Sequence, residues 1–221
     1  MFCVRGRNHL KRLKRQCPHI KLSLSVHQEN GSSAFSSISP SPSLRKQFVN
    51  SVYGYVRDYE YDGVDLNLNL ENASEFAMTT NKSNIVLLIK DLREALDKDH
   101  ILTASLSKDL SIIDAAYDIP AFAEQLQYLH VKSFDYHGAE EGLTGPAAPL
   151  RSRDSSSVVA TIEQLKSRGA PCSKLVLGVP MFGRTFLLKE LAGNQPFGSA
   201  VEGAGMKGPF TNTTDMLGDE E

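Results

Sequence analysis

The sequence of 221 residues contains no tryptophan and only three cysteines, Cys3, Cys17 and Cys172. An odd number of cysteines without the close spacing of zinc ligands supports neither a disulfide framework nor a metal site. We therefore expect no metal and no other cofactor. Tryptophan offers the largest apolar ring surface, so aromatic contacts to a ligand must come from tyrosine and phenylalanine.

A strong net charge and long hydrophobic runs are also absent. The chain has 24 basic and 26 acidic residues and a formal net charge of −2, which gives no electrostatic reason to expect a nucleic-acid partner. No apolar run approaches the roughly 20 residues that cross a bilayer, so we expect no membrane partner. The basic segment 1–16 lacks the apolar core of a secretory signal. We interpret this segment as a solvated helix face, with a nuclear or nucleic-acid patch as the less favoured alternative.

Four Asn-x-Ser/Thr sequons begin at Asn30, Asn72, Asn81 and Asn212. They would permit N-glycosylation if the chain entered the secretory pathway. Because some sequons arise by chance in a serine-rich sequence, these four favour an extracellular ancestry only weakly.

The spacing of apolar residues predicts strands that alternate with helices, which indicates a β/α layer architecture. The clearest helix carries a predicted buried stripe of Ile85, Leu88, Ile89, Leu92 and Leu96. The predicted strands are 19–26, 65–71, 101–106, 128–135 and 174–183; the predicted helices are 7–16, 44–58, 83–97, 121–126 and 155–168; the remaining long segments, 30–43 and 186–221, are predicted as a loop and as irregular structure.

The segment Tyr61–Glu71 is central, because polar and leucine residues alternate strictly from Asp65 onward. In a strand, Asp65, Asn67, Asn69 and Glu71 would share one side and the three leucines the other. A row of carboxylates and amides suits acid–base chemistry on a polar substrate, because neighbouring carboxylates shift each other's pKa. The alternative is a polar ladder at a strand end near a turn.

The order of residues in this segment resembles the motif D-G-x-D-x-D-x-E of glycoside hydrolase family 18, the chitinases and chitinase-like lectins. Asp62, Gly63 and Asp65 match the motif. Asn67 replaces the last aspartate, and Asn69 stands at the position of the family's catalytic glutamate. The resemblance therefore implies a catalytic motif at these positions with two of its acids replaced.

In the family, the glutamate protonates the glycosidic oxygen, and the adjacent aspartate orients the N-acetyl group that attacks the anomeric carbon. An asparagine amide has no proton to transfer at usable pH. We therefore expect Asn69 to hold a sugar without cleaving it. Glu71 lies about 6.6 Å farther along the strand, whereas a proton donor must come within about 3 Å of its acceptor. We predict that Glu71 does not replace the missing acid.

Two later segments also resemble family strands. V-K-S-F-D-Y-H-G is similar to the sixth-strand motif M-x-Y-D-Y-H-G, with Phe134 in place of tyrosine. G-V-P-M-F-G-R-T-F is similar to the seventh strand, with Phe182 in place of tyrosine. Without the resemblance, Phe134 would be interpreted as a core residue. The substrate-binding residues that the resemblance implies are Phe134, Asp135, Tyr136, Phe182 and Arg184.

The matched segments correspond to family strands three to seven. They imply an α/β fold, an incomplete (β/α)8 TIM barrel over residues 1–185, followed at 186–221 by the start of an inserted small α/β domain. A full barrel typically needs about 250 residues, and strands one, two and eight have no counterpart here. We expect a fragment of a longer protein in preference to a chain that a protein partner completes, and the sequence does not identify such a partner.

The resemblance favours a catalytically inactive chitinase-like protein, extracellular and able to bind chitin or N-acetylglucosamine oligomers. We expect weak binding, because the family tryptophan beside the catalytic glutamate is Leu68 here. An active chitinase that cleaves β-1,4 links with retention is the first alternative. A nonfunctional fragment is the second.

Overall fold

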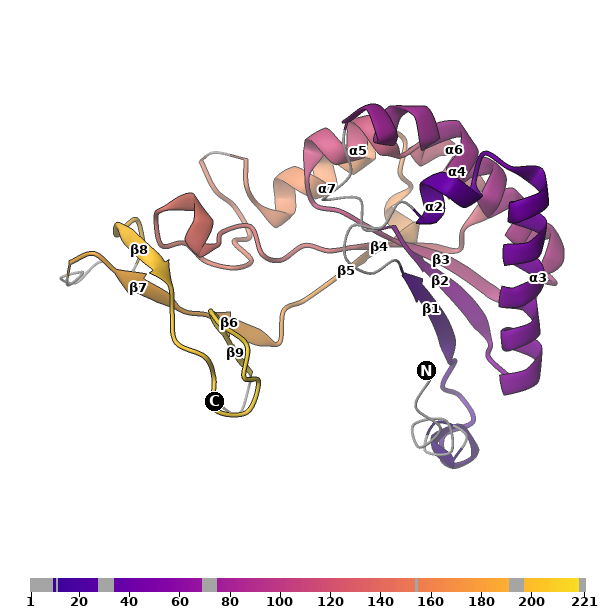
Figure 1. Ribbon diagram of the computed structural model, residues 1–221, viewed down its shortest axis with the longest axis horizontal. Coiled ribbons are helices and arrows are strands. Elements are labelled where there is room, and N and C mark those ends of the chain that lie inside the picture. The colour runs from indigo at the N-terminus through magenta and orange to yellow at the C-terminus, as the bar shows by residue number, and fades with distance from the viewer. Residues whose placement is uncertain are drawn as a thin grey trace. The chain divides into compact units, whose positions relative to one another are not determined.

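The computed structural model describes residues 10, 12–27, 34–68, 75–153, 155–190 and 197–218, without the side chains of 34 and 75–81. Two compact units are present, and Figure 1 shows their elements. The first comprises Met1–His130 and Arg168–Val176, and the second comprises Val131–Ser167 and Leu177–Glu221. The two units are defined by which residues pack together and do not correspond to the predicted domains. The predicted domain boundary between residues 185 and 186 therefore stays a prediction.

The first unit is built on a five-stranded sheet with the order β1-β2-β3-β4-β5. β1, β2 and β3 pair in parallel, with Asp65 opposite Ser25 on one side and Thr103 on the other. Parallel neighbours require a crossover connection, which helices supply here. The strands are β1 (Ser23–His27), β2 (Gly63–Asn67), β3 (Ile101–Leu106), β4 (Tyr128–Val131) and β5 (Leu175–Leu177).

Helices of the first unit pack together beside this sheet, and α4 contacts α3, α5 and α6 (Figure 1). The predicted stripe on the α4 helix and just beyond it is confirmed, because Ile85, Leu88, Ile89, Leu92 and Leu96 are all at most 2% exposed. Burying each such side chain contributes about 1.5–3 kcal/mol. The helices are α2 (Ala34–Ile38), α3 (Pro42–Tyr59), α4 (Glu75–Ala95), α5 (Leu110–Ala116) and α6 (Ile119–Gln125).

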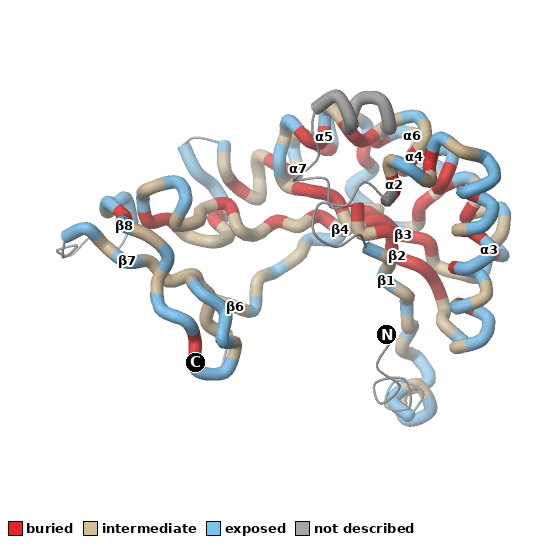
Figure 2. Tube along the Cα trace, viewed as in Figure 1, coloured by how far each residue is buried: buried red, intermediate tan, exposed pale blue. Residues whose placement is uncertain are grey.

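The core lies between the helices and one face of the sheet, where Figure 2 shows buried residues concentrated along β2 and β3. Leu66 and Leu68 are fully buried, whereas Asn67 between them is half-buried. Burial of the predicted apolar side is therefore confirmed for Leu66 and Leu68, whereas Asp65 on the polar side is also buried, at 8% exposure. Asn69 and Glu71 lie outside the described residues.

Two short helices were not predicted from periodicity. The loop prediction for 30–43 is wrong over α2, where Phe35 is 3% exposed and meets the Phe48 ring edge-on at 6.1 Å. In α5, Asp109 caps the first turn by accepting a 2.8 Å hydrogen bond from the Ser111 N–H. Helices this short are stabilised by tertiary packing. They also have too few turns to show a helical period in the sequence.

Three strands also end earlier than predicted. β2 ends at Asn67, β4 at Val131 and β5 at Leu177. Asp135 has φ 57, which is incompatible with continued strand conformation. Pro180 has no N–H to donate to a ladder, so a strand through 174–183 is interrupted.

The described residues of the second unit form one α-helix, a short 3-10 helix (Ala139–Glu141) and two small antiparallel pairs of strands. β6 pairs with β9, and β7 pairs with β8. The prediction of irregular structure over 186–221 is therefore wrong for β7, β8 and β9. Among the described residues, no helix is both long and apolar enough to span a membrane. The elements are α7 (Val158–Ser167), β6 (Phe182–Arg184), β7 (Phe186–Leu188), β8 (Val201–Ala204) and β9 (Met216–Gly218).

Candidate functional site

Asp65 is the centre of a polar cluster on one face of the sheet in the first unit. Its carboxylate accepts hydrogen bonds from Thr103 Oγ1 at 2.6 Å and from Ser105 Oγ at 3.0 Å, both on β3. Ser25 Oγ on β1 lies 3.4 Å away, and His130 Nδ1 on β4 lies 3.0 Å away. These side chains share a face because side chains alternate along each strand while the register aligns neighbouring strands.

The surroundings of Asp65 keep its carboxyl ionised. Burial by itself would raise the pKa of Asp65, but the interactions with His130, Thr103 and Ser105 outweigh it and hold the pKa below its ordinary value. The side chain is only 12% exposed. The Asp65 carboxylate is therefore an anion held in place by hydrogen bonds with four different residues.

Asn67 lies at the carboxyl end of β2, in register with His27 on β1 and Ser105 on β3. Its side-chain oxygen is buried and has no hydrogen-bond partner among the described residues. An unsatisfied buried acceptor costs about 1–3 kcal/mol. The end of β2 thus holds a buried acceptor without a partner among the described residues.

The backbone of β2 is held in place at both of its ends. A Cβ atom at Gly63 would collide with the carbonyl oxygen of Ile101, so glycine lets β2 and β3 start side by side. Tyr117 Oη donates a 2.9 Å hydrogen bond to the carbonyl oxygen of Leu68, just beyond the strand. Leu68, the residue just after β2, is therefore held in place.

Asp62 lies at the opposite end of β2 from Asn67. It accepts a 2.8 Å hydrogen bond from the Leu22 N–H and pairs with Lys14 at 2.9 Å. Burial alone would raise the pKa of Asp62, but Lys14 and the Leu22 N–H hold it below its ordinary value. This placement gives Asp62 a role in joining the starts of β1 and β2, away from the Asp65 cluster.

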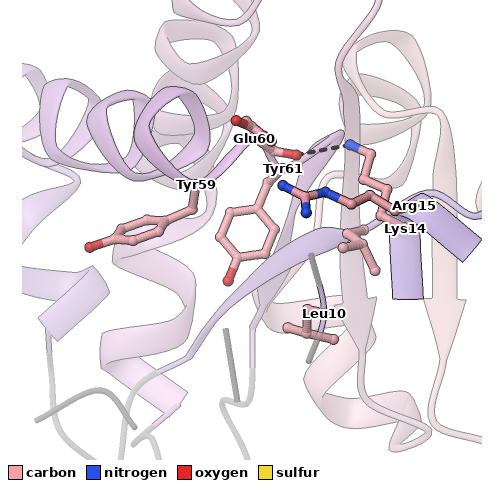
Figure 3. Close-up of a pocket in the computed structure, with 7 residues that line it drawn as sticks. Leu10, Lys14, Arg15, Tyr59, Glu60 and Tyr61 are labelled. Carbon is pink, nitrogen blue, oxygen red and sulfur yellow. Dashed lines mark hydrogen bonds between the residues drawn. The ribbon is translucent and has the colours of Figure 1, made fainter. Parts of the chain in front are cut away.

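A pocket of about 130 Å³ adjoins Asp62, and Figure 3 shows its lining. In this pocket, Lys14 donates a 2.9 Å hydrogen bond to the carbonyl oxygen of Glu60. Glu60 caps the carboxyl end of α3 and has a left-handed backbone conformation. The pocket thus lies at the amino-terminal end of the strands, whereas Asn67 lies at the other end. The lining residues are Leu10, Lys14, Arg15, Leu22, Tyr59, Glu60 and Tyr61.

The second unit places Arg184 between two carboxylates. Arg184 contacts Asp135 Oδ1 at 2.8 Å through Nε and Nη2, and Asp215 Oδ1 at 2.8 Å through Nη1. Burial alone would lower the pKa of Arg184, but the two carboxylates outweigh it and raise the pKa above its ordinary value. Both predicted residues, Asp135 and Arg184, are therefore brought together, and Asp215 joins them.

Phe134 and Phe182 also meet in the second unit, with ring centroids 6.0 Å apart in an edge-to-face arrangement. The Arg184 guanidinium lies 5.3 Å from the centroid of the Phe182 ring. A Cβ atom at Gly178 would come within 2.9 Å of the Phe134 ring, so glycine leaves room for it. The two phenylalanines at family tyrosine positions form one apolar contact.

Tyr136 differs from its neighbours because it is buried, at 7% exposure. Its hydroxyl is hydrogen-bonded to Thr161 Oγ1 at 2.7 Å, and burial raises its pKa. Its position within the second unit is that of a packing residue that secures α7. The ring is not exposed in the folded chain, and its predicted role in substrate binding stays a prediction.

Several residues of these clusters were missed by sequence reasoning. Thr103, Ser105 and His130 share the strand parity that places them beside Asp65, and this parity was the available signal. Asp215 carried no such signal, because only folding brings its loop to Arg184. Within the described ranges, no group of three or more His, Cys, Asp or Glu side chains is placed to hold a metal ion.

Comparison with known proteins gives a match to the family model of glycosyl hydrolases family 18 over residues 4–221. The protein "Probable chitinase 2" of Drosophila melanogaster is 37% identical over 220 residues, which cover 98% of this chain and 45% of that protein. Chitotriosidase-1 of Mus musculus is 29% identical, over 94% of this chain and 48% of that protein. The chain thus spans about half the length of these relatives.

Solved structures agree with the family match. A group IV chitinase of Ostrinia furnacalis in complex with allosamidin superposes with a TM-score of 0.90 at 30% identity, over 98% of this chain and 61% of that one. Human YKL-39, described as a pseudo-chitinase with retained chitooligosaccharide binding properties, has a TM-score of 0.86 at 27% identity, over 99% of this chain and 63% of that one.

These matches, together with the parallel sheet and its covering helices, confirm the predicted fold as part of a (β/α)8 barrel. The match extends through nearly the whole sequence, including both units. The chain belongs to glycosyl hydrolase family 18 and is chitinase-like.

Proposed function

We propose that this chain is a catalytically inactive chitinase-like domain that binds chitin or N-acetylglucosamine oligomers weakly. The observation that carries the proposal is Asn69, an amide at the position of the family's proton donor. Because an amide cannot protonate a leaving group near neutral pH, the change removes the acid while retaining polarity.

Two features of the first unit support binding. Asp65 is an ionised acceptor held by Thr103, Ser105 and His130. Asn67 has a buried oxygen without a described partner at the carboxyl end of β2, the end at which barrel enzymes of this architecture bind substrates. The N–H of an acetamido group is a donor of the kind that this acceptor lacks. The retained chitooligosaccharide binding described for human YKL-39, a pseudo-chitinase, is a precedent for such a function.

An active chitinase is the alternative from the enzyme class. Three independent changes oppose it: Asn69 lacks the proton, Asn67 lacks the charge that steadies the N-acetyl group, and Phe134 lacks the tyrosine hydroxyl. Glu71 is the carboxyl nearest to Asn69 in the sequence, and both residues lie outside the described part of the chain.

We propose an extracellular location for the protein, on the basis of the family resemblance and the four sequons. On the same basis we propose that the protein is a glycoprotein. Fractionation of cells that express the natural gene, probed with an antibody to this chain, tests the location. Retention of all protein inside the cells would contradict it.

The first experiment is calorimetric titration of the purified chain with N-acetylglucosamine oligomers, followed by product analysis of the same samples. Asn67→Ala should weaken binding, because it removes the free acceptor. Asn50→Ala, on the exposed side of α3, is the matched control and should leave binding unchanged.

The outcomes separate the alternatives. Binding without cleavage agrees with the proposal, and absence of binding by a cooperatively folded sample contradicts it. Cleavage of the oligomer would establish the enzyme alternative, and loss of that cleavage in Glu71→Gln would show that Glu71 supplies the proton.

A further inference from the structure

The loop between β8 and β9 in the second unit carries one of the four sequons, Asn212-Thr213-Thr214. All three residues are exposed. N-glycosylation requires an accessible asparagine and a hydroxyl residue two positions later, which Thr214 provides. This sequon therefore meets the steric requirement in the folded chain.

The loop also presents the sequon in a turn. Asn212 has φ 49, a left-handed conformation that asparagine tolerates better than most residues. Its N–H donates a 3.0 Å hydrogen bond to the carbonyl oxygen of Gly208, which closes the turn. Thr211 Oγ1 donates a 3.1 Å hydrogen bond to the carbonyl oxygen of Met216, at the start of β9. The turn is thus anchored at its base while the sequon projects from it.

The two hydroxyl groups of the sequon differ in their partners. Thr213 Oγ1 donates to the carbonyl oxygen of Thr211 at 3.1 Å. The Thr214 hydroxyl and the side-chain amide of Asn212 make no hydrogen bond to any residue in the described part of the chain. The groups that take part in glycosylation are therefore the available ones.

The other sequons have no comparable support. Asn81 lies within α4, where the backbone is helical on both sides. Asn30 and Asn72 lie outside the described residues. Asn212 is the sequon for which the structure supplies evidence.

The same loop exposes large apolar side chains. Met206 is 88% exposed and Phe210 is 78% exposed. A pocket of about 530 Å³ beside the loop has a largely apolar lining that includes Phe186, Leu187 and Met206. Apolar surface of this kind promotes self-association, and a bulky hydrophilic group nearby opposes it.

We propose that Asn212 is an N-glycosylation site whose glycan covers the apolar surface of the β8–β9 loop. The inference rests on the proposed extracellular location. In the reaction, the amide nitrogen of Asn212 bonds to C1 of a sugar on a lipid-diphosphate-linked oligosaccharide donor. The bond from C1 to the diphosphate oxygen breaks, the lipid diphosphate leaves, and the amide loses one proton, with no oxidation or reduction.

The test is expression of the full chain behind a cleavable secretion signal in eukaryotic cells, with glycopeptide mass spectrometry on the secreted and the retained protein together. We expect a glycan on Asn212. Thr214→Ala breaks the sequon and should abolish that glycan. Thr213→Ala is the matched control, because the middle position of a sequon accepts alanine, and this variant should retain the glycan.

The role of the glycan is tested by light scattering of the secreted proteins. Thr214→Ala should self-associate more than either the unchanged chain or Thr213→Ala. An unmodified Asn212 peptide in the total protein would overturn the site, and equal scattering of the three proteins would overturn the role. Oligomer binding is measured separately on bacterially produced chain, so failure of the proposed sugar binding does not affect this result.

Discussion

The Asp65 cluster of the first unit and the Arg184 cluster of the second unit both shield a charged side chain from solvent, but with different partners. Each holds a charged side chain away from solvent, Asp65 at 12% exposure and Arg184 at 18%. Asp65 is surrounded by hydroxyls and an imidazole, whereas Arg184 lies between two carboxylates.

The difference concerns what each cluster leaves available to a ligand. Arg184 contacts carboxylates through three of its nitrogens, so its charge is compensated within the second unit. Beside Asp65, the Asn67 oxygen has no described partner. The first cluster therefore keeps a buried acceptor without a described partner, whereas the charges of the second cluster are paired with one another, and the substrate-binding roles of both clusters stay predictions.

The strongest test of this comparison is Asp65→Ala, which removes the acceptor shared by Thr103, Ser105 and His130. Of these donors, the buried Thr103 hydroxyl would be left without an acceptor, which costs about 1–3 kcal/mol. We therefore expect the free energy of unfolding to fall by up to about 3 kcal/mol in urea titration. Asp58→Ala, at an exposed pair with Arg57, should change it by less than about 0.5 kcal/mol. Equal stability of the two variants would contradict the role given to Asp65.

The Arg184 cluster should respond to backbone conformation as well as to charge. Asp215 has φ 66, where a Cβ atom costs roughly 1–2 kcal/mol. Both Asp215→Ala and Asp215→Gly remove the ion pair, but only glycine relieves the backbone. We expect Asp215→Gly to be more stable than Asp215→Ala by about 1 kcal/mol in urea titration. Oligomer binding should be unaffected in both, and a loss of binding would contradict a structural role for Asp215.

The pH dependence of stability should also follow the Asp65 cluster. The pKa of Asp65 in the folded chain lies below its ordinary value of 3.8. A lowered folded pKa stabilises the fold at pH values above the unfolded pKa, and this contribution is lost as pH falls through the lower folded value. The free energy of unfolding should therefore decrease below about pH 4. Asp65→Asn should show a shallower acid limb, and an unchanged limb would assign the acid loss to other groups such as Asp62.

The smallest expected effect concerns the phenylalanine pair. Phe134→Tyr restores the hydroxyl present in the resembled motif, and a hydrogen bond from it contributes about 0.5–1.5 kcal/mol. We expect oligomer affinity to rise roughly two- to tenfold, which calorimetry measures. Phe48→Tyr, in the first unit beside Phe35, is the control and should leave affinity unchanged. No gain from Phe134→Tyr would place this ring outside the sugar contact.

Sequence reasoning was most successful where a regular period was long. The buried stripe of α4 and the burial of Leu66 and Leu68 were predicted and are confirmed. It was least successful at α2 and α5, because five and seven residues carry too few turns to show a helical period. The strand ends were overextended because the period of two does not mark where hydrogen-bonded pairing stops.

For the candidate site, the sequence identified the chain positions but not their partners. It located Asp65 and Asn67 by motif and predicted their common face, but the motif gives no sign that Asp62 turns to Lys14 at the other end of the strand. It also grouped Tyr136 with the sugar platforms, whereas the fold buries that ring against Thr161.

The sequence by itself determined the family, the order of strands and helices, and the loss of the family acid at position 69. These properties depend on residue identity and local period, both of which are present in the chain before it folds. Only the tertiary structure decided that four residues on three other strands surround Asp65, that Asp215 closes on Arg184, and that Asn212 projects from a turn. Contacts between distant segments depend on register and loop path, which a linear pattern does not encode.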